Sequence, residues 1–185
     1  LAKRRSIGEI VVGTGLHNLW RADYASYWTQ MLAGLRLQGG GDVRLSVELS
    51  SEADFRAMEA WQAAAPSSFG EFASRLNLVR FSARPVEQNP GMGDWNVSAT
   101  ANSIETSYAR VKRLFPNSSV SVSNVTVTAC RDAQWSEDEA ACPQGALFDR
   151  SYQSSGLKAF FSALNMLSAE TRSSLYGVEF LQATT

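Results

Sequence analysis

The sequence predicts an α+β fold in which an N-terminal amphipathic helix is followed by repeated β-α-β units. Two kinds of periodicity support this prediction. Apolar residues recur every 3.6 positions in some segments, as in helices, and alternate with polar residues in others, as in strands. The composition is that of an ordered globular chain, because 44% of the 185 residues are hydrophobic and 19% are charged. This length suffices for one well-cored domain or two small ones.

The first predicted element is an amphipathic helix over residues 16–37, "LHNLWRADYASYWTQMLAGLRL". The glycines of "QGGG" at 38–41 end it, because glycine is common just past a helix C-terminus. Residues 1–41 are therefore predicted to form a helical stalk or linker. Aromatic residues are enriched in interface cores, so part of the stripe is a candidate contact surface, with ordinary core packing as the alternative. These candidates are Trp20, Tyr24, Tyr27 and Trp28.

The second predicted region, residues 42–93, is a β-α-β unit. "DVRLSVELS" alternates as a half-buried strand, with Leu45 and Val47 on one face and Ser46 and Glu48 on the other. "SEADFRAMEAWQAAA" follows as a helix capped by a serine, and "LVRFSARPV" alternates again as a strand. The turn-rich stretch "EQNPGMG" at 87–93 then joins this unit to the rest.

The third predicted region, residues 94–185, contains four strands and two helices. The strands are "WNVSATAN", "SVSVSNVTVTAC", "ALFDRSYQS" and "LYGVEFLQA", and the helices are "SIETSYARVKRLFP", capped by Asn102, and "SGLKAFFSALNML". Their order, β-α-β-β-α-β, is that of a ferredoxin-like core, in which two helices cover one face of a four-stranded antiparallel sheet. Two alternatives remain. Residues 42–129 show the same β-α-β-β-α-β order in an overlapping grouping, or all six predicted strands could share one sheet.

The two cysteines, Cys130 and Cys142, flank an acidic loop. Zinc needs about four Cys or His ligands, and a redox pair is usually C-x-x-C, so neither chemistry fits this spacing. Two buried free thiols and a disulfide both remain open. We favour a disulfide, because it would close a loop between two strand-like segments and stabilise the fold by roughly 3 kcal/mol. A disulfide would place the domain outside the reducing cytosol.

Little in the sequence indicates catalysis, a cofactor or a metal. The net charge of −1 gives no basic surface for nucleic acid. The "GTG" of residues 13–15 lacks the third glycine of a dinucleotide fingerprint, and the single histidine, His17, has no catalytic partner nearby. The basic run at Arg110, Lys112 and Arg113 fits a helix C-terminus better than a phosphate site. We therefore predict a non-catalytic domain.

The aromatic-led strand, helix and valine-rich strand of "WNVSATANSIETSYARVKRLFPNSSVSVSNVTVTA" resemble a known family. They are similar to the periplasmic ferredoxin-like domains of type IV pilus and type II secretion inner-membrane assembly proteins, the PilN/PilO and GspL/GspM class, the type IVb pilus branch above all. This resemblance implies a periplasmic scaffold tethered to the inner membrane by an anchor upstream. It also implies a homodimer, or a heterodimer with other assembly proteins.

Two alternatives come from other resemblances. "LWRADYASYWTQMLAGLRL" looks like a helix of the type VI secretion inner-membrane protein IcmF/TssM, although that likeness ends where strands begin. A ferredoxin-like fold could also serve as a small-ligand-binding module. An acylphosphatase-like enzyme is disfavoured, because "ATANSIE" holds neither the arginine nor the glycine that its phosphate loop needs.

The cysteine prediction is tested by the intact mass of the unreduced protein, before and after thiol alkylation under denaturing conditions. We expect a mass lighter by two hydrogen atoms and no alkylation until a reductant is added, because both thiols would be consumed in the Cys130–Cys142 bond. Labelling of both cysteines without a reductant would rule out the bond and remove the basis for an extracytoplasmic location.

Overall fold

The computed structural model describes residues 8–39, 42–89, 92–125, 127, 130–131 and 147–180. The chain divides into two compact units. Unit 1 comprises residues 1–82 and 109–121, and unit 2 comprises residues 83–108 and 122–185. This division differs from the predicted boundaries at residues 41 and 93.

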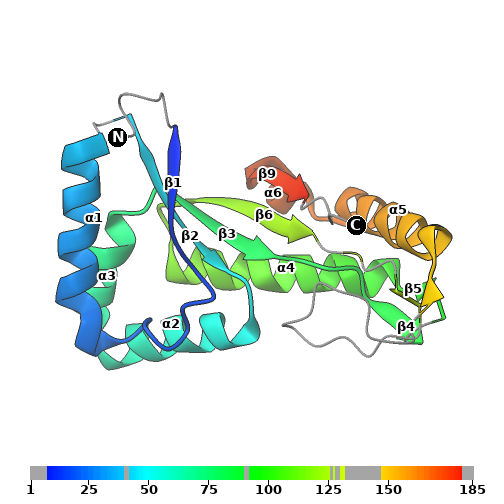
Figure 1. Cartoon of the computed structure of the whole chain (residues 1–185), viewed down its shortest axis with the longest axis horizontal. Helices are drawn as coiled ribbons and strands as arrows, with labels where there is room; N and C mark the ends of the chain where they lie inside the picture. The colour runs from blue at the N-terminus through cyan, green and yellow to red at the C-terminus, as the bar shows by residue number, and fades with distance from the viewer. Residues whose placement is uncertain are drawn as a thin grey trace. The chain divides into compact units, whose positions relative to one another are not determined.

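The central element is a five-stranded sheet with the order β1-β2-β3-β6-β9 (Figure 1). Strands β1 and β2 pair in parallel, as do β2 and β3. Helices separate the successive strands of the sheet, as parallel pairing requires. The strands are β1 (Glu9–Thr14), β2 (Arg44–Leu49), β3 (Leu78–Ser82), β6 (Ser119–Val125) and β9 (Leu175–Phe180).

The helices and two short hairpins fill the connections between these strands. The helices are η1 (Ala22–Tyr24), α1 (Ala25–Gly39), α2 (Glu52–Ala64), α3 (Pro66–Ser74), α4 (Val97–Leu114), α5 (Arg150–Met166) and α6 (Ala169–Ser174). One hairpin pairs β4 (Glu87–Asn89) with β5 (Asp94–Trp95), and the other pairs β7 (Cys130–Arg131) with β8 (Leu147–Phe148). No helix in the described part of the chain is both long and apolar enough to cross a bilayer.

This architecture contradicts the predicted ferredoxin-like core. That core needs antiparallel pairing of four strands, whereas the observed sheet has five strands in chain order and parallel pairing in its first three. A chain-ordered parallel sheet with intervening helices is the arrangement of (β/α) barrels, while doubly wound sheets reverse their order at a switch point. The fold is therefore α/β rather than α+β.

Two predicted strands were wrong, and helix caps explain both errors. The segment "WNVSATAN" holds only the two-residue strand β5, because Asn96 then accepts a hydrogen bond from the Ala99 amide at 2.8 Å and starts α4. Likewise "ALFDRSYQS" is mostly the start of α5, because Asp149 accepts from the amides of Ser151 and Tyr152. Each cap removed a strand from the expected order.

The predicted helix over residues 16–37 begins later than expected. Residues 16–21 precede the short helix η1, and α1 starts at Ala25. Residues 9–14, which lie within the predicted stalk, instead form β1 at one end of the sheet order. Residues 9–14 are therefore part of the sheet.

Unit 1 has a core built around aromatic rings on one face of its strands. Leu45, Val47 and Leu49 of β2 are fully buried. Helices α1 and α3 lie side by side next to these strands (Figure 1). The rings of the cluster pack with centroids 4.5–6.5 Å apart, the usual range for favourable aromatic pairs. They belong to Trp20, Trp28, Trp61, Phe69, Phe72 and Phe115.

Gly13 is required by the close approach of Trp20. A Cβ atom at residue 13 would lie 2.7 Å from the nearest carbon of the Trp20 ring and 2.9 Å from the Leu16 side chain. Trp20 is buried among other aromatic rings, so it cannot move without disturbing those contacts. The tryptophan therefore selects glycine at this position of β1.

We expect Gly13→Ala to destabilise the protein by about 1–3 kcal/mol, because the added methyl group overpacks the Trp20 contact. Gly34→Ala in α1 is the matched control, since nothing lies within 4 Å of its Cβ position. The control should be neutral or stabilise by up to about 1 kcal/mol, because alanine favours helix. Urea unfolding of the two variants measures both effects, and equal stability of the two would contradict the packing argument.

Candidate functional site

The candidate site lies on the polar face of strands β1, β2 and β3. Because successive side chains of a strand point to opposite faces, burying Leu45, Val47 and Leu49 directs Ser46 and Glu48 to the other face. The parallel register places Glu48 opposite Arg80 of β3. We define the polar face as Glu9, Thr14, Ser46, Glu48, Arg80 and Ser82.

An ion pair occupies one part of the polar face. The Arg80 guanidinium holds the Glu9 carboxylate by two contacts, at 2.8 Å from Nη2 and 3.1 Å from Nε. Ser46 donates a hydrogen bond to the same carboxylate at 2.5 Å. The Arg80 and Glu9 side chains are only 14% and 19% exposed. A two-point contact of this kind fixes the geometry as well as contributing energy.

These partners control the ionisation of Glu9. Burial raises the pKa of this carboxyl, but the hydrogen bonds from Arg80 and Ser46 and the charges of Arg80 and Arg44 outweigh burial. The net result is a pKa below the ordinary value. Glu9 therefore stays ionised, and its role is to hold Arg80 rather than to donate a proton.

Glu48 is the carboxylate nearest the carboxyl end of β2 and is only 8% exposed. It accepts a hydrogen bond from Thr14 Oγ1 at 3.2 Å and a longer one from Ser82 Oγ at 3.4 Å. The two hydroxyls come from the strands on either side, β1 and β3, and both lie at the last residue of their strand. In (β/α)-barrel enzymes this carboxyl edge of the sheet carries the catalytic groups.

A bulge in β1 brings Thr14 to Glu48. Val11 pairs with Ser46 and Thr14 pairs with Glu48, so β1 advances three residues while β2 advances two. Without the extra residue, strand alternation would point Thr14 to the apolar face. Bulges often occur beside active sites, where they redirect a side chain. Gly13, selected by Trp20, lies within this bulge.

A second charged cluster in unit 1 is structural. Arg110 contacts Glu52 at 2.6 Å and Glu59 at 3.0 Å, and lies over the Phe55 ring at 4.4 Å. The hydrogen bonds to these carboxylates raise the pKa of Arg110 above its ordinary value. Arg113 also pairs with Glu59, at 2.7 Å. These contacts tie α4 to the carboxylates of α2.

The residues predicted as protein contacts separate into two groups. Trp20 and Trp28 are buried in the aromatic core, so they are not available at a surface. Tyr24 and Tyr27 are 42% and 63% exposed.

His17 is exposed, as expected. Cys142 lies outside the described residues, and the surroundings of the Cys130 side chain are not described either. The Cys130–Cys142 disulfide therefore stays a prediction.

The sequence contained Glu48 but gave no sign of its role. The strand pattern assigned it to an exposed polar face, because alternation alone cannot distinguish a solvated face from a covered one. Ser46 and Glu48 turn out to be buried with partners on neighbouring strands. In the described part of the chain, no group of three or more His, Cys, Asp or Glu side chains could hold a metal ion.

Comparison with known proteins supports the fold and shows no family. No protein-family model and no curated protein matches the sequence. A solved structure of a fungal β-1,4-galactanase matches with a TM-score of 0.50 and 14% sequence identity. The match covers 94% of this chain and 48% of the galactanase, so the chain spans about half the length of that structure. At this identity the likeness concerns the fold alone.

We expect Glu9→Gln to lower the free energy of unfolding at neutral pH by about 1–2 kcal/mol, because Arg80 loses a charged partner. The pKa of Glu9 is lowered by folding, so its contribution is present above about pH 4.3 and is lost as the pH falls through the folded value. The difference in free energy of unfolding between wild type and Glu9→Gln should therefore be constant near neutral pH and become smaller at acidic pH. Urea unfolding across this pH range measures the gap, and a gap that does not depend on pH would contradict the assignment.

Proposed function

We propose that this chain belongs to a carbohydrate-active protein of (β/α)-barrel type, and that the carboxyl edge of β1, β2 and β3 acts on a polysaccharide. The observation that carries the proposal is the buried Glu48 carboxylate, held by hydroxyls from both neighbouring strands. Glycoside hydrolysis uses a pair of carboxyl groups, and Glu48 would supply one of them. The likeness in fold to a β-1,4-galactanase supports a β-1,4-linked galactan as the first substrate to test.

The surroundings of Glu48 hold its carboxylate in one orientation. Hydrogen bonds from Thr14 and Ser82 reach its two oxygens, one each. A carboxylate held in this way requires little reorganisation when charge develops on a bound sugar. Glu9 and Arg80 would support the site from the same face by keeping the polar side chains of the strands in register.

A second candidate is the periplasmic assembly domain suggested by the pilus and secretion resemblance. The exposed rings of Tyr24 and Tyr27 favour it, because exposed aromatics suit protein contacts. Its topological support was the ferredoxin-like core, which the parallel sheet replaces. We therefore place it second.

The two candidates are separated by Glu48→Gln. We expect the wild-type protein to release reducing ends from β-1,4-galactan and the variant to lose about 10²–10⁴-fold in rate, because a positioned carboxyl contributes that much to catalysis. Glu71→Gln is the matched control: Glu71 is an exposed carboxylate of α3 whose partner is Arg75, one helical turn away. The control should retain full activity.

Thermal unfolding shows whether the Glu48→Gln protein is folded. Equal rates for the folded variant and the wild type would contradict the role of Glu48. A wild-type protein that releases no sugar from galactan or from other β-1,4-linked polysaccharides would move the assembly domain to first place.

A further inference from the structure

Two exposed tyrosine rings lie at the start of α1 in unit 1. Tyr24 and Tyr27 are 42% and 63% exposed. Tyr24 is the last residue of η1 and α1 begins at the next residue, so the two tyrosines are three positions apart along one helical stretch. Side chains at this spacing are neighbours on one face of a helix. The two rings therefore form one exposed aromatic surface, which we call the tyrosine platform.

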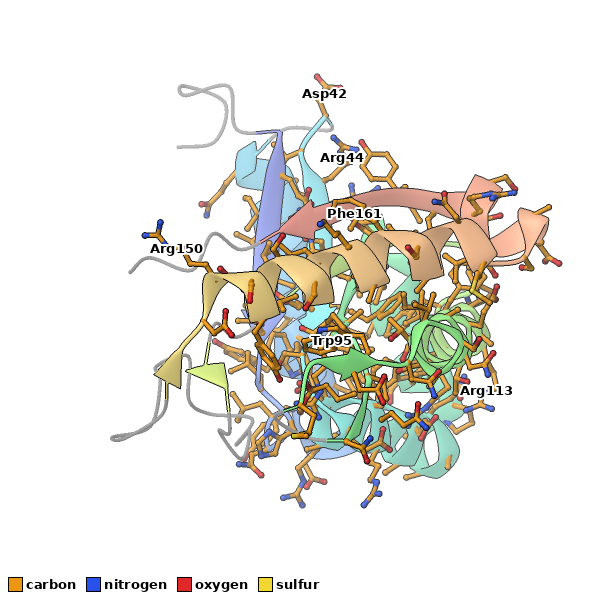
Figure 2. All side chains as sticks on the ribbon, turned by 90° about the vertical axis from the view of Figure 1, so that its right-hand side faces the viewer. Asp42, Arg44, Trp95, Arg113, Arg150 and Phe161 are labelled. Carbon is orange, nitrogen blue, oxygen red and sulfur yellow. The ribbon has the colours of Figure 1, made fainter. Side chains whose placement is uncertain are left out.

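The direction of the chain places the tyrosine platform at the carboxyl edge of the sheet. Strand β1 ends at Thr14, whose hydroxyl donates to Glu48, and the loop after it leads to η1 and the first turn of α1 (Figure 1). The last turn of α1 lies at the opposite edge, because a Cβ at Gly39 would be 3.1 Å from the side chain of Val43, the residue before β2. Asp42 projects from this amino edge in Figure 2.

The carboxyl edge is open to solvent between Glu48 and the tyrosine platform. Thr14 and Gly15, at the end of β1, and Ser50, just after β2, are all exposed. A Cβ at Gly15 would lie 3.9 Å from Ser50 Oγ, so the two strand ends are adjacent. Most of residues 14–24 are exposed as well. In (β/α)-type sheets, the loops at this edge bind the ligand.

The tyrosine platform rests on the rigid aromatic core of unit 1. The Tyr27 ring meets the Trp28 ring edge-on, with centroids 6.0 Å apart. Trp28 is buried, its Nε1 donates to the Leu19 carbonyl at 2.9 Å, and its ring packs on Trp20 with centroids 4.5 Å apart. A ring supported in this way loses little conformational entropy when a ligand covers its exposed part.

The surroundings of the tyrosine platform are polar and electrically balanced. Arg21 and Asp23 form an ion pair with each other at 3.0 Å, so neither sign of charge dominates beside the rings. Two rings among exposed polar residues do not make the apolar core of a protein interface, which buries about 800 Å² on each partner. These polar neighbours are Arg21, Asp23, Ser26 and Gln30.

We propose that the tyrosine platform is a subsite that binds neutral pyranose units of a polysaccharide lying along the carboxyl edge. A pyranose ring has an apolar face of C–H groups, which fits an exposed aromatic ring, and hydroxyls at its rim, which fit tyrosine hydroxyls. The inference rests on the proposed polysaccharide function. It adds to that function a binding surface in the same unit as Glu48.

The test measures affinity for soluble β-1,4-galactan by electrophoresis in gels containing the polysaccharide. We expect Tyr27→Ala to weaken binding about threefold to tenfold, because one stacking surface is lost. Tyr27→Phe should bind within about twofold of wild type, because it keeps the ring. Hydrolysis gives a second readout: KM for galactan should rise in Tyr27→Ala by the same factor as the loss of affinity.

Leu37→Ala is the matched control. Leu37 is an 87% exposed apolar residue near the other end of α1, away from the carboxyl edge, so its removal should leave galactan affinity and KM unchanged. Thermal unfolding shows whether each variant is folded. Tyr24→Ala provides the same test at the second ring if Tyr27→Ala does not fold.

The outcomes distinguish the subsite from the function on which it rests. Wild-type affinity and KM in a folded variant that carries both Tyr24→Ala and Tyr27→Ala would overturn the subsite. The proposed function would still stand if Glu48→Gln abolishes hydrolysis. Weaker self-association of that double variant in sedimentation, with unchanged galactan affinity, would assign the rings to a protein contact and also overturn the subsite. A wild-type protein that neither binds nor cleaves any tested polysaccharide would overturn both proposals.

Discussion

Burial of one face of β2 and β3 is the constraint on which the rest of unit 1 depends. Leu45, Val47 and Leu49 of β2 are completely inaccessible, and Val79 and Phe81 lie beside them on β3. Because side chains alternate along a strand, this packing places Ser46, Glu48 and Arg80 on the opposite face whatever their polarity. The candidate site is therefore a direct consequence of how the apolar face is covered.

The polar face is stable because its groups satisfy one another. A buried charge is costly unless it is paired and hydrogen-bonded, and Arg80, Glu9 and Ser46 meet this condition together. Glu48 accepts hydrogen bonds from hydroxyls of both flanking strands, Thr14 on β1 and Ser82 on β3.

Local packing and site geometry are connected through β1. Trp20 fills the space above Gly13, the bulge adds one residue, and Thr14 is redirected towards Glu48. In unit 2 a similar relation holds between Gly156 and Trp95, where the missing side chain makes room for an aromatic ring. In both units the absence of a side chain on a glycine makes room for an aromatic ring.

The sequence by itself determined where most helices and strands lie, because their periods are local properties of a few consecutive residues. It also predicted the serine-capped helix after β2, where the Ser51 side chain accepts a hydrogen bond from the Asp54 amide. It failed at Asn96 and Asp149, where single capping side chains outweighed an alternating pattern. The tertiary structure alone decided the pairing direction of the strands and the burial of Glu48. Both depend on contacts between residues more than thirty positions apart, such as Thr14 with Glu48, and no local pattern encodes such contacts.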